Sequence, residues 1–419
     1  MTPPDVIVAG SGPAGALIAR DLARAGLRVT ILEQGGDAVS AATTNLWKLW
    51  RKREMLHIAP GVALLRGVRV GGGSTAFYHT AVTPPLEMFS RHGVDLGDDV
   101  QAVLRDIPHQ PLQPALIGPM AARIANAATA LGLPWQPLSK MIDQSLCQDG
   151  VCPASAFWSA QWLLTEAIAL GAKLESGVRV CRVLLSAGRA LGVEIEDGAG
   201  RRELRAGRVI LAAGGLGSPA ILRRSGVEAA GQGFFCDPLR ILIARSPDAA
   251  PGTPELPMAA GIIDSSAGTL LSDITIPETF FRTFAWSACR PGMLPHYRRS
   301  MMIMVKIRDD ILGEVHANGG AWRHFSPADH ARMRQGVAQA RHILEAAGGR
   351  GIFASPWLAA HPGGSVRLGH LLDDRLACQV PNLHVCDASA IPEPWGLPPT
   401  VTILSLAKYL ARTLIREAS

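Results

Sequence analysis

Residues 5–15 read Asp-Val-Ile-Val-Ala-Gly-Ser-Gly-Pro-Ala-Gly, and this stretch decides the fold. The apolar run at 6–8 predicts a short, buried parallel strand. Gly10, Gly12 and Gly15 then follow with the spacing G-x-G-x-x-G. The first glycine permits a tight turn, the second lets a pyrophosphate approach the backbone, and the third lets the next helix pack closely.

The residues after this loop complete a nucleotide-binding unit. Residues 14–25 predict a helix that ends at Gly26, and 27–32 predict a second strand with Glu33 at its end. A carboxylate about twenty residues beyond the loop accepts hydrogen bonds from a ribose diol and disfavours a 2′-phosphate. Because strand, loop, helix, strand and acid occur in this order, we expect FAD or NAD rather than NADP, and not a glycine turn without a ligand.

The composition indicates a well-buried globular protein. The chain has 419 residues, 48% of them hydrophobic, which is enough for two domains. The net charge of +6 comes mostly from Arg, without a dense basic run, so we expect no nucleic-acid partner. The excess of Arg indicates either a basic surface or steering of an anionic substrate. No apolar run is long enough to span a membrane, and no signal peptide is evident, so we expect a cytoplasmic protein.

The seven cysteines are odd in number and scattered, which predicts reduced thiols. Cys147 and Cys152 form one close pair, and Cys378 and Cys386 form another. Neither pair has C-x-x-C spacing or a neighbouring cluster of metal ligands, so we predict neither a redox disulfide nor a metal site.

Two stretches near the first loop indicate further contacts with a cofactor. Residues 45–55 are rich in Trp, Lys and Arg, which predicts an amphipathic helix or a lid. Residues 67–75 contain Gly71-Gly72-Gly73 followed by Ser and Thr, where the backbone can press against a flat or charged ligand. The alternative for this second stretch is a flexible turn.

The rest of the chain alternates between two patterns. The following list gives the elements that we predict: helices over 119–130, 157–170 and 328–347, a helix beginning at Ser218-Pro219 and one after Pro399; strands over 173–175, 179–184, 191–196, 208–213 and 382–386; and antiparallel strands over 239–244, 261–264, 269–276 and 301–307. A run of antiparallel strands between parallel-sheet segments indicates an inserted domain.

Five of these stretches together resemble the glucose–methanol–choline (GMC) oxidoreductases. They are the glycine loop with Glu33, Gly71-Gly72-Gly73-Ser74, the strand and turn from Arg208 to Pro219, the segment His361-Pro362-Gly363-Gly364 with Arg367-Leu368-Gly369, and Asp387-Ala388-Ser389 followed by Pro399-Thr400-Val401-Thr402-Ile403. The resemblance implies an α/β fold with a FAD-binding Rossmann-like domain and an inserted antiparallel-sheet substrate domain. We assign 1–84, 155–233 and 370–419 to the first domain and 85–154 and 234–369 to the second.

The resemblance also implies FAD as the cofactor and oxidation of an alcohol by hydride transfer to flavin N5. The residues that match the family's FAD-binding positions are Gly10, Gly12, Pro13, Ala14, Gly15, Glu33, Gly72, Gly73, Ser74, Val180, Ala213, Gly214, Asp387, Ala388, Pro399 and Thr400. His361 matches the active-site histidine, and an imidazole suits the acid–base step because it titrates near neutral pH. We expect His361 at the junction of the two domains.

The chain departs from the family pattern at two places. The family has Asn or His where this chain has Pro398, which offers neither a polar side chain nor a backbone N–H. Tyr78, His79 and Trp395 are candidates for the missing partner of His361. Ala76 stands where some members carry a flavin-linking histidine, so we expect non-covalent FAD, with attachment at His79 as the alternative.

Three functional readings stay open at this point. The first is a FAD-dependent alcohol dehydrogenase or oxidase that passes electrons to oxygen or another acceptor, with a role in biosynthetic tailoring as one option. The second is a flavoenzyme of the same fold with other chemistry, such as a lyase or a desaturase, because Pro398 is atypical. The third is a flavin-binding protein without catalysis, which the retention of His361 disfavours.

Overall fold

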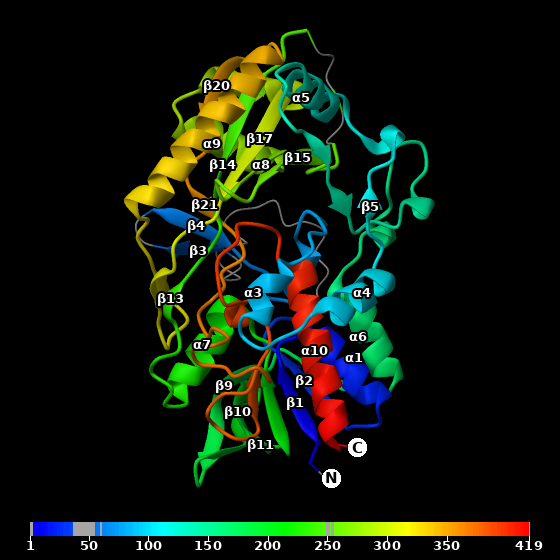
Figure 1. The fold of residues 1–419 in the computed structure, drawn as a ribbon, viewed down its shortest axis with the longest axis vertical. Coiled ribbons are helices and arrows are strands. Elements are labelled where there is room, and N and C mark those ends of the chain that lie inside the picture. Colours follow the sequence, from blue (N-terminus) through cyan, green and yellow to red (C-terminus); the bar gives the residue numbers. More distant parts are fainter. Residues whose placement is uncertain (1–2, 37–54, 59–60, 249–251, 253–254, 419) are drawn as a thin grey trace.

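The computed structural model describes residues 3–36, 55–58, 61–248, 252 and 255–418. The molecule is elongated, with a parallel sheet at one end and a larger antiparallel sheet at the other (Figure 1). Both chain termini lie at the parallel-sheet end. This arrangement confirms the predicted α/β fold class.

The parallel sheet has five strands in the order β22-β12-β1-β2-β8. Their bounds are Leu383–Val385, Arg208–Leu211, Val6–Ala9, Val29–Glu33 and Lys173–Ser176. All four pairings are parallel, so the carboxyl ends of the strands meet at one edge of the sheet. Helix α1 (Pro13–Arg24) packs against α6 (Ala160–Ala169) and α10 (Thr400–Ala418) beside this sheet (Figure 1).

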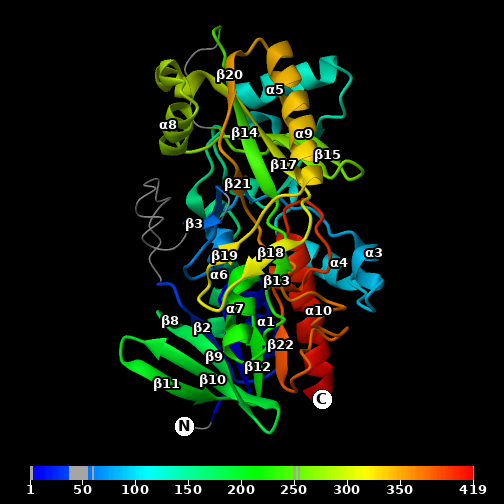
Figure 2. The same ribbon diagram turned by 90° about the vertical axis from the view of Figure 1, so that its left-hand side faces the viewer.

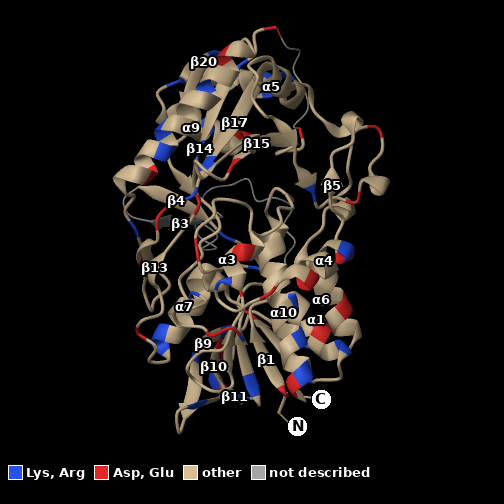
Figure 3. Cartoon of the chain, in the orientation of Figure 1, with Lys and Arg blue, Asp and Glu red and all other residues tan. Residues whose placement is uncertain are grey.

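A three-stranded antiparallel sheet extends from the parallel one (Figure 2). Its order is β11-β10-β9, and the bounds are Gly200–Arg205, Arg189–Asp197 and Arg179–Ser186. Arg182 and Glu194 lie opposite each other on this sheet and form an ion pair of 2.9 Å. Figure 3 shows the same mixture of basic and acidic residues over much of the described chain. Many basic side chains are therefore neutralised by near neighbours.

The second large sheet has nine strands and is mostly antiparallel. The order is β3-β4-β21-β14-β17-β16-β15-β6, and β20 also pairs with β14. The bounds in that order are Met55–Ile58, Val62–Leu65, Leu358–Ala359, Pro238–Arg245, Ser300–Ile307, Thr269–Asp273, Ala260–Asp264 and Gln136–Pro137, with Arg350–Ala354 for β20.

Alternate residues of the central strand β17 enter two different cores. Ile303 and Val305 point to the side covered by α5 (Pro119–Ala130) and α9 (Pro327–Ala346). Met302 and Met304 point to the opposite side, where α8 (Glu278–Ser287) packs. The period of two along a strand explains this division, and it makes β17 buried on both faces.

The remaining elements connect these layers. They are α3 (Leu86–Ser90), α4 (Gly97–Asp106), α7 (Gly214–Arg224), β5 (Gln110–Pro111), β7 (Ser139–Lys140), β13 (Gln232–Phe234), β18 (Leu312–Val315), β19 (Ala321–Trp322) and six 3-10 helices, η1 (Gly72–Thr75), η2 (Pro114–Leu116), η3 (Gln144–Leu146), η4 (Ala154–Ala156), η5 (Pro291–Arg299) and η6 (Ala388–Ala390), among the described residues. No helix within the described ranges has the length and apolar character needed to cross a membrane.

Helix α7 begins earlier than the sequence indicates. We expected its start at Ser218, but it starts at Gly214. Inside the helix, Ser218 Oγ accepts a hydrogen bond at 3.1 Å from the backbone N–H of Ala213, the N-cap residue. Pro219 has no N–H for the carbonyl of Gly215, and the hydroxyl of Ser365 donates to that oxygen at 2.7 Å instead.

Helix α8 lies in a region where we expected strands and little helix. Its sequence contains Phe and Thr residues, which have modest helix propensity. Phe281 and Phe284 are buried against the nine-stranded sheet, and this packing outweighs the weak propensity. The Trp-rich segment 45–55 lies outside the described residues, apart from Met55 at the start of β3.

Cys147 and Cys152 form a disulfide, so the prediction of reduced thiols is wrong for this pair. Gln148 and Val151 between them exchange two backbone hydrogen bonds, of 2.9 and 2.8 Å. This tight turn brings the two thiols together, although their spacing matches no redox motif. The other five cysteines are free.

Packing places two segments differently from the domain division that we propose. Strands β3 and β4 belong to the nine-stranded sheet, although they come from the segment 1–84. Helix α4, from the segment 85–154, packs against α10 beside the parallel sheet. Met88 and Phe89 of α3, which also come from 85–154, lie in the same core as α10. These pieces pack across the proposed division, which stays a prediction.

The glycine loop combines two kinds of steric constraint. A Cβ on Gly10, which has φ +110°, would overlap the carbonyl of Ala212, and a Cβ on Gly15 would overlap the carbonyl of Gly10. A Cβ on Gly12 would meet no protein atom within 4 Å, and the φ of Gly12 is −67°. Gly15 is therefore needed for the fold itself, whereas Gly12 borders open space.

We predict that Gly15→Ala lowers the free energy of unfolding by about 3 kcal/mol, because the methyl group forces backbone apart. Gly12→Ala is the matched variant, and we expect a change below about 1 kcal/mol. Urea unfolding of the cofactor-free protein, followed by tryptophan fluorescence, measures both. Equal losses for the two variants would contradict this assignment of roles.

Candidate active site

Segments far apart in the sequence converge beside the glycine loop. The N–H of Gly71 donates to Ser11 Oγ at 3.2 Å, and Gly72 approaches Gly12 so closely that its Cβ would lie 2.9 Å from the Gly12 Cα. A Cβ on Gly215 would overlap the carbonyl of Pro362. The predicted cofactor segments and the segment that carries His361 are thus in direct contact.

Glu33 ends β2 beside the loop and is buried. Its Oε2 accepts hydrogen bonds from the N–H and hydroxyl of Ser11 at 3.1 and 2.6 Å, and Oε1 accepts one from the N–H of Gly35 at 2.8 Å. Burial raises the pKa of Glu33, although these hydrogen bonds oppose that rise. The carboxylate is held in one orientation, and lone pairs that remain on it can accept from a ribose diol.

The backbone around this point fits a dinucleotide. Gly12 is the N-cap of α1, so the positive end of the helix dipole faces any ligand at the loop. Hypothetical Cβ atoms on Gly73 and Gly214, like that on Gly12, would meet no protein atom within 4 Å. We call the backbone at these three glycines the cradle; it leaves room for a ligand, which is compatible with FAD.

Several predicted binding residues use their side chains to shape this cradle. Ser74 Oγ donates to the carbonyl of Gly71 at 2.6 Å and accepts from the N–H of Ala160 at 2.9 Å. The carboxylate of Asp387 accepts from Gly214 N–H, Ser218 Oγ, Ser389 N–H and Ser389 Oγ at 2.5–2.8 Å. Burial raises the pKa of Asp387, against the effect of these donors. Asp387 therefore joins the end of β22 to the start of α7.

The remaining predicted residues lie around the same cradle. Pro13 and Ala14 open α1, Ala213 precedes α7, and Ala388 accepts a hydrogen bond from the N–H of Gly364 at 3.0 Å. Val180 lies on β9, which starts beside the end of β2 because Val178 donates to the carbonyl of Glu33 at 2.8 Å. Pro399 and Thr400 are buried at the N-terminus of α10. Their roles toward FAD stay predictions.

His361 follows β21 and has a left-handed backbone, with φ +56°. Such a conformation is strained for a residue other than glycine and is common at functional sites. The Nδ1 atom lies 2.9 Å from Lys306 Nζ and 3.3 Å from Asp237 Oδ2. The side chain is 29% exposed, and Nε2 makes no hydrogen bond within the part of the chain that the structure describes. One nitrogen is thus anchored and the other is available to a ligand.

Lys306 and Asp237 form an ion pair of 2.8 Å, and both side chains are 1% exposed. Burial lowers the pKa of Lys306, although the neighbouring Asp237 carboxylate raises it. Burial and the nearby Lys306 cation together lower the pKa of His361 to about 4. The imidazole is therefore neutral near pH 7.

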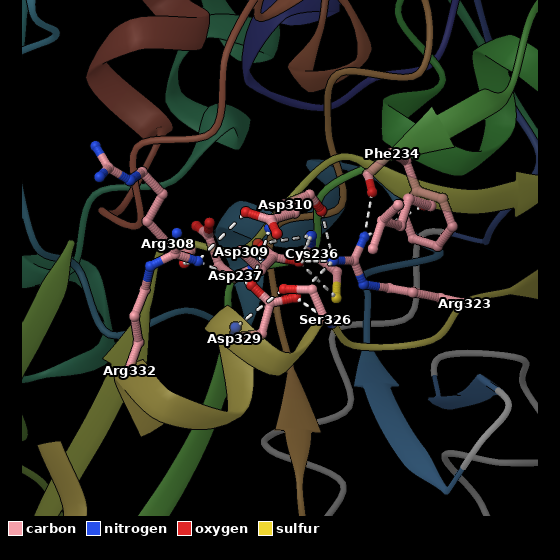
Figure 4. A network of polar contacts seen from close by, with 11 residues as sticks. Phe234, Cys236, Asp237, Arg308, Asp309, Asp310, Arg323, Ser326, Asp329 and Arg332 are labelled. Carbon is pink, nitrogen blue, oxygen red and sulfur yellow. Dashed lines mark hydrogen bonds and ion pairs between the residues drawn. The ribbon is translucent and has the colours of Figure 1, made fainter. Parts of the chain in front are cut away.

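A second buried pair fixes the position of Asp237 (Figure 4). Asp309 accepts hydrogen bonds from the N–H groups of Cys236 and Asp237, each at 3.0 Å, and pairs with Arg323 at 2.6 Å. Burial raises the pKa of Asp309 to about 7, while the Arg323 guanidinium acts in the opposite direction. Asp237 has φ +48°, and these bonds hold its backbone in that conformation.

Lys306, Asp237 and Asp309 were not predicted from the sequence. One signal was available, because Lys306 is the single charged residue in the apolar strand 300–307. A lysine in a strand buried on both faces requires a partner, and this requirement indicates a structural or a chemical role for it. The identity of the partner was not predictable from spacing.

The three residues that we considered as partners of His361 lie elsewhere. The ring of His79 packs at a tilt against Phe77 and Phe157, at centroid distances of 4.3 and 5.0 Å, and burial together with Lys140 lowers its pKa to about 3. Burial raises the pKa of Tyr78 to about 12. Neither these two nor Trp395 makes a hydrogen bond to His361 among the described residues. Lys306 and Asp237 contact His361 instead.

An apolar surface extends from Lys306 along the same face of β17. Met304 and Met302 follow it at steps of two residues and pack with Ile241 of β14. The segment that precedes α10 reaches this surface through Trp395 and Leu397. Met302 and Met304 are each 3% exposed, so this apolar side of β17 is a packed core next to Lys306.

Comparison with known proteins agrees with this geometry. The family model for the N-terminal part of the GMC oxidoreductases matches residues 28–239, and the model for the C-terminal part matches 324–407. His361 lies within the second range, and Lys306 lies between the two ranges.

Relatives with similar sequences carry the same family name. An uncharacterized GMC-type oxidoreductase of Mycobacterium tuberculosis is 32% identical over 253 residues, which are 54% of this chain but only 40% of that relative. Another, from Sinorhizobium fredii, is 25% identical over 99% of this chain and 95% of its own length. A long-chain-alcohol oxidase of Arabidopsis thaliana is 20% identical over 98% of this chain and 67% of its own length.

Solved structures share the fold at low sequence identity. Pyridoxine 4-oxidase from Mesorbium loti has a TM-score of 0.73 at 19% identity, over 98% of this chain and 99% of that one. A formate oxidase has a TM-score of 0.77 at 15% identity, over 99% of this chain and 98% of that one. The family models, the FAD cradle and the shared fold lead to one conclusion. The chain belongs to the GMC oxidoreductases, a family of FAD-dependent flavoproteins.

Proposed function

We propose that the protein oxidises the CH–OH group of a small-molecule alcohol and that His361 handles the hydroxyl proton. The observation that supports this most is the state of His361, whose Nδ1 is anchored by buried groups while Nε2 has no hydrogen-bond partner among the residues that the structure describes. Bound FAD supplies the oxidant, which accepts a hydride from the substrate carbon. Loss of the hydride requires loss of the hydroxyl proton, and a base within hydrogen-bond reach assists that loss.

Different residues of the chain bind the cofactor, position His361 and exclude water. The cradle of Gly12, Gly73 and Gly214 holds the cofactor without covalent attachment. Gly215 brings the His361 segment against that cradle, and His361 accepts the proton at Nε2. The apolar side of β17 with Met302 and Met304 excludes water from the reacting carbon and favours a substrate with an apolar body.

Two finer points belong to the same proposal. The electron acceptor in the second half of the reaction is oxygen or another oxidant, and a role in biosynthetic tailoring accords with a small apolar substrate. We keep a cytoplasmic location as a prediction. The disulfide between Cys147 and Cys152 counts against it, because such bonds are rare in reducing compartments.

We predict that His361→Ala slows flavin reduction by a factor of about 10²–10⁴, the usual contribution of a general base. Anaerobic stopped-flow mixing with pyridoxine and with long-chain alcohols, followed by bleaching of the flavin absorbance, measures this step. His342→Ala provides the control, since His342 lies on α9 and away from the site. Unchanged bleaching in the His361 variant would refute the role of His361. A reaction without net bleaching would favour the lyase alternative.

We also predict that Pro398→Ala changes the rate of flavin reduction less than about threefold, because a proline side chain offers no group for proton transfer. The flavin content of the purified variant, measured from its absorbance, shows whether the neighbouring residues at the start of α10 still bind. A loss of a hundredfold at normal flavin content would place proton chemistry at this position after all.

A further inference from the structure

Lys306, His361 and Asp237 form a triangle of polar atoms beneath the proposed proton acceptor. Lys306 Nζ lies 2.9 Å from His361 Nδ1 and 2.8 Å from Asp237 Oδ2, and Nδ1 lies 3.3 Å from the same oxygen. Two nitrogen atoms at 2.9 Å require one hydrogen between them. Either the lysine ammonium donates to Nδ1, or Nδ1–H donates to a neutral lysine amine. A neutral amine that donates to an unprotonated Nδ1 is disfavoured, because the Nδ1 lone pair would then face Asp237 Oδ2 at 3.3 Å with no ammonium to pair with that carboxylate.

These two arrangements differ by one proton in total. When Lys306 is neutral, the imidazole carries its hydrogen on Nδ1, and Nε2 is free to act as a base. When Lys306 is an ammonium, the neutral imidazole carries its hydrogen on Nε2 and acts only as a donor there. The second arrangement is the first after Nε2 has gained a proton and Nδ1 has passed one to the lysine.

We propose, on the basis of the proposed function, that Lys306 is the final holder of the substrate's hydroxyl proton and that His361 transfers it. The O–H bond of the alcohol breaks as an Nε2–H bond forms, and the Nδ1–H bond breaks as an Nζ–H bond forms. The hydride leaves the carbon for the bound flavin, which is the oxidant. Lys306 becomes an ammonium ion paired with Asp237, and His361 stays uncharged at the end.

This transfer overcomes a weakness of His361 as a lone base. Beside a charged Lys306, the pKa of His361 is about 4, so a lone imidazole next to that ammonium would bind the substrate's proton weakly. A general base works best when its pKa is near the working pH. A buried lysine has a pKa below its ordinary value but is intrinsically more basic than imidazole. Lys306 and His361 therefore titrate as a coupled pair, in which the imidazole passes the proton on and the amine keeps it.

The charged groups around Lys306 leave the Asp237 carboxylate available to pair with the new ammonium. The charged groups that bear on Lys306 are Asp237 at the start of β14 and Asp309 after β17, and Arg323 neutralises Asp309. The Cys236 thiol is beside Asp309, and burial holds its pKa well above the ordinary value, so it stays neutral. Lys140, the other buried lysine, is different, because it donates to oxygen atoms of Tyr78, Thr80 and Pro257 and to no nitrogen.

NMR of the FAD-loaded enzyme with 15N-labelled histidine tests the transfer without a substrate. His361→Asn identifies the signals of the His361 ring. Between pH 10 and pH 5 we expect the ring to change from the Nδ1–H to the Nε2–H tautomer while staying neutral. A ring that keeps one tautomer throughout, or that becomes an imidazolium instead of changing tautomer, would overturn the proposal.

Lys306→Arg is the sharpest variant, because arginine keeps the ion pair with Asp237 but does not lose its proton. We expect the ring to hold the Nε2–H tautomer at every pH, and flavin reduction to slow at least a hundredfold. A purely structural role would leave the rate near that of the wild type. Lys306→Met tests the same point without a charge, and in it the pKa of His361 rises because the neighbouring cation is gone.

The matched control is Lys408→Met, which removes a lysine from another ion pair, with Asp21 at 2.7 Å, on α10. It should leave both the tautomer change and the rate intact.

In the wild type, flavin reduction should fall as the pH is lowered through the pKa of the pair, since only the neutral amine accepts the proton. If His361→Ala has no effect on bleaching, the proposed function fails. If only the Lys306 variants have none, the transfer fails.

Discussion

The buried ion pair between Arg323 and Asp309 is the constraint on which the site depends. Arg323 is fully buried and also donates to the carbonyls of Phe234, Leu312 and Asp310, so it joins β13, β18 and the end of β17. Asp309 in turn fixes the backbone before β14. Removal of one member of such a pair typically costs 3–5 kcal/mol, because the other charge stays buried without a partner. The ion pair between Arg323 and Asp309 therefore holds the strained backbone of Asp237.

The active site is assembled from both ends of the molecule. The parallel sheet supplies the cradle for FAD, and the nine-stranded sheet supplies Lys306 and Asp237. His361 connects the two, because it follows β21 and immediately precedes the backbone that presses against Gly215. A shift of either sheet would therefore change the distance between the glycine loop and His361.

Local patterns predicted much of the fold. The strand over 6–8, the helix over 14–25 and the helix over 119–130 were expected within one or two residues of their observed bounds, since each depends on neighbouring residues. The start of α7 was misplaced because Ser218 lies inside the helix, where its hydroxyl accepts a hydrogen bond from the N–H of Ala213. Helix α8 was missed because its stability depends on packing, which a window of sequence does not contain.

The candidate site was only partly predictable from local sequence patterns. His361 was found through a motif, but its contacts lie 55 and 124 residues away in the chain. Such contacts depend on which strands pair and in which register, and the register that sets Lys306 opposite Leu239 arises from the whole sheet. Residue identity indicated an unusual lysine, and only the three-dimensional arrangement identified its partner.

The alternation of side chains along β17 has a consequence for how new activities could arise on this scaffold. Positions 302 and 304 contact the apolar region, whereas 306 holds the polar triangle, and all three are fixed by one ladder of backbone hydrogen bonds. Exchange of the two methionines alters shape and size on that apolar side without displacing the lysine. One strand thus carries an apolar pair and the polar triangle side by side, and changes to the first need not disturb the second.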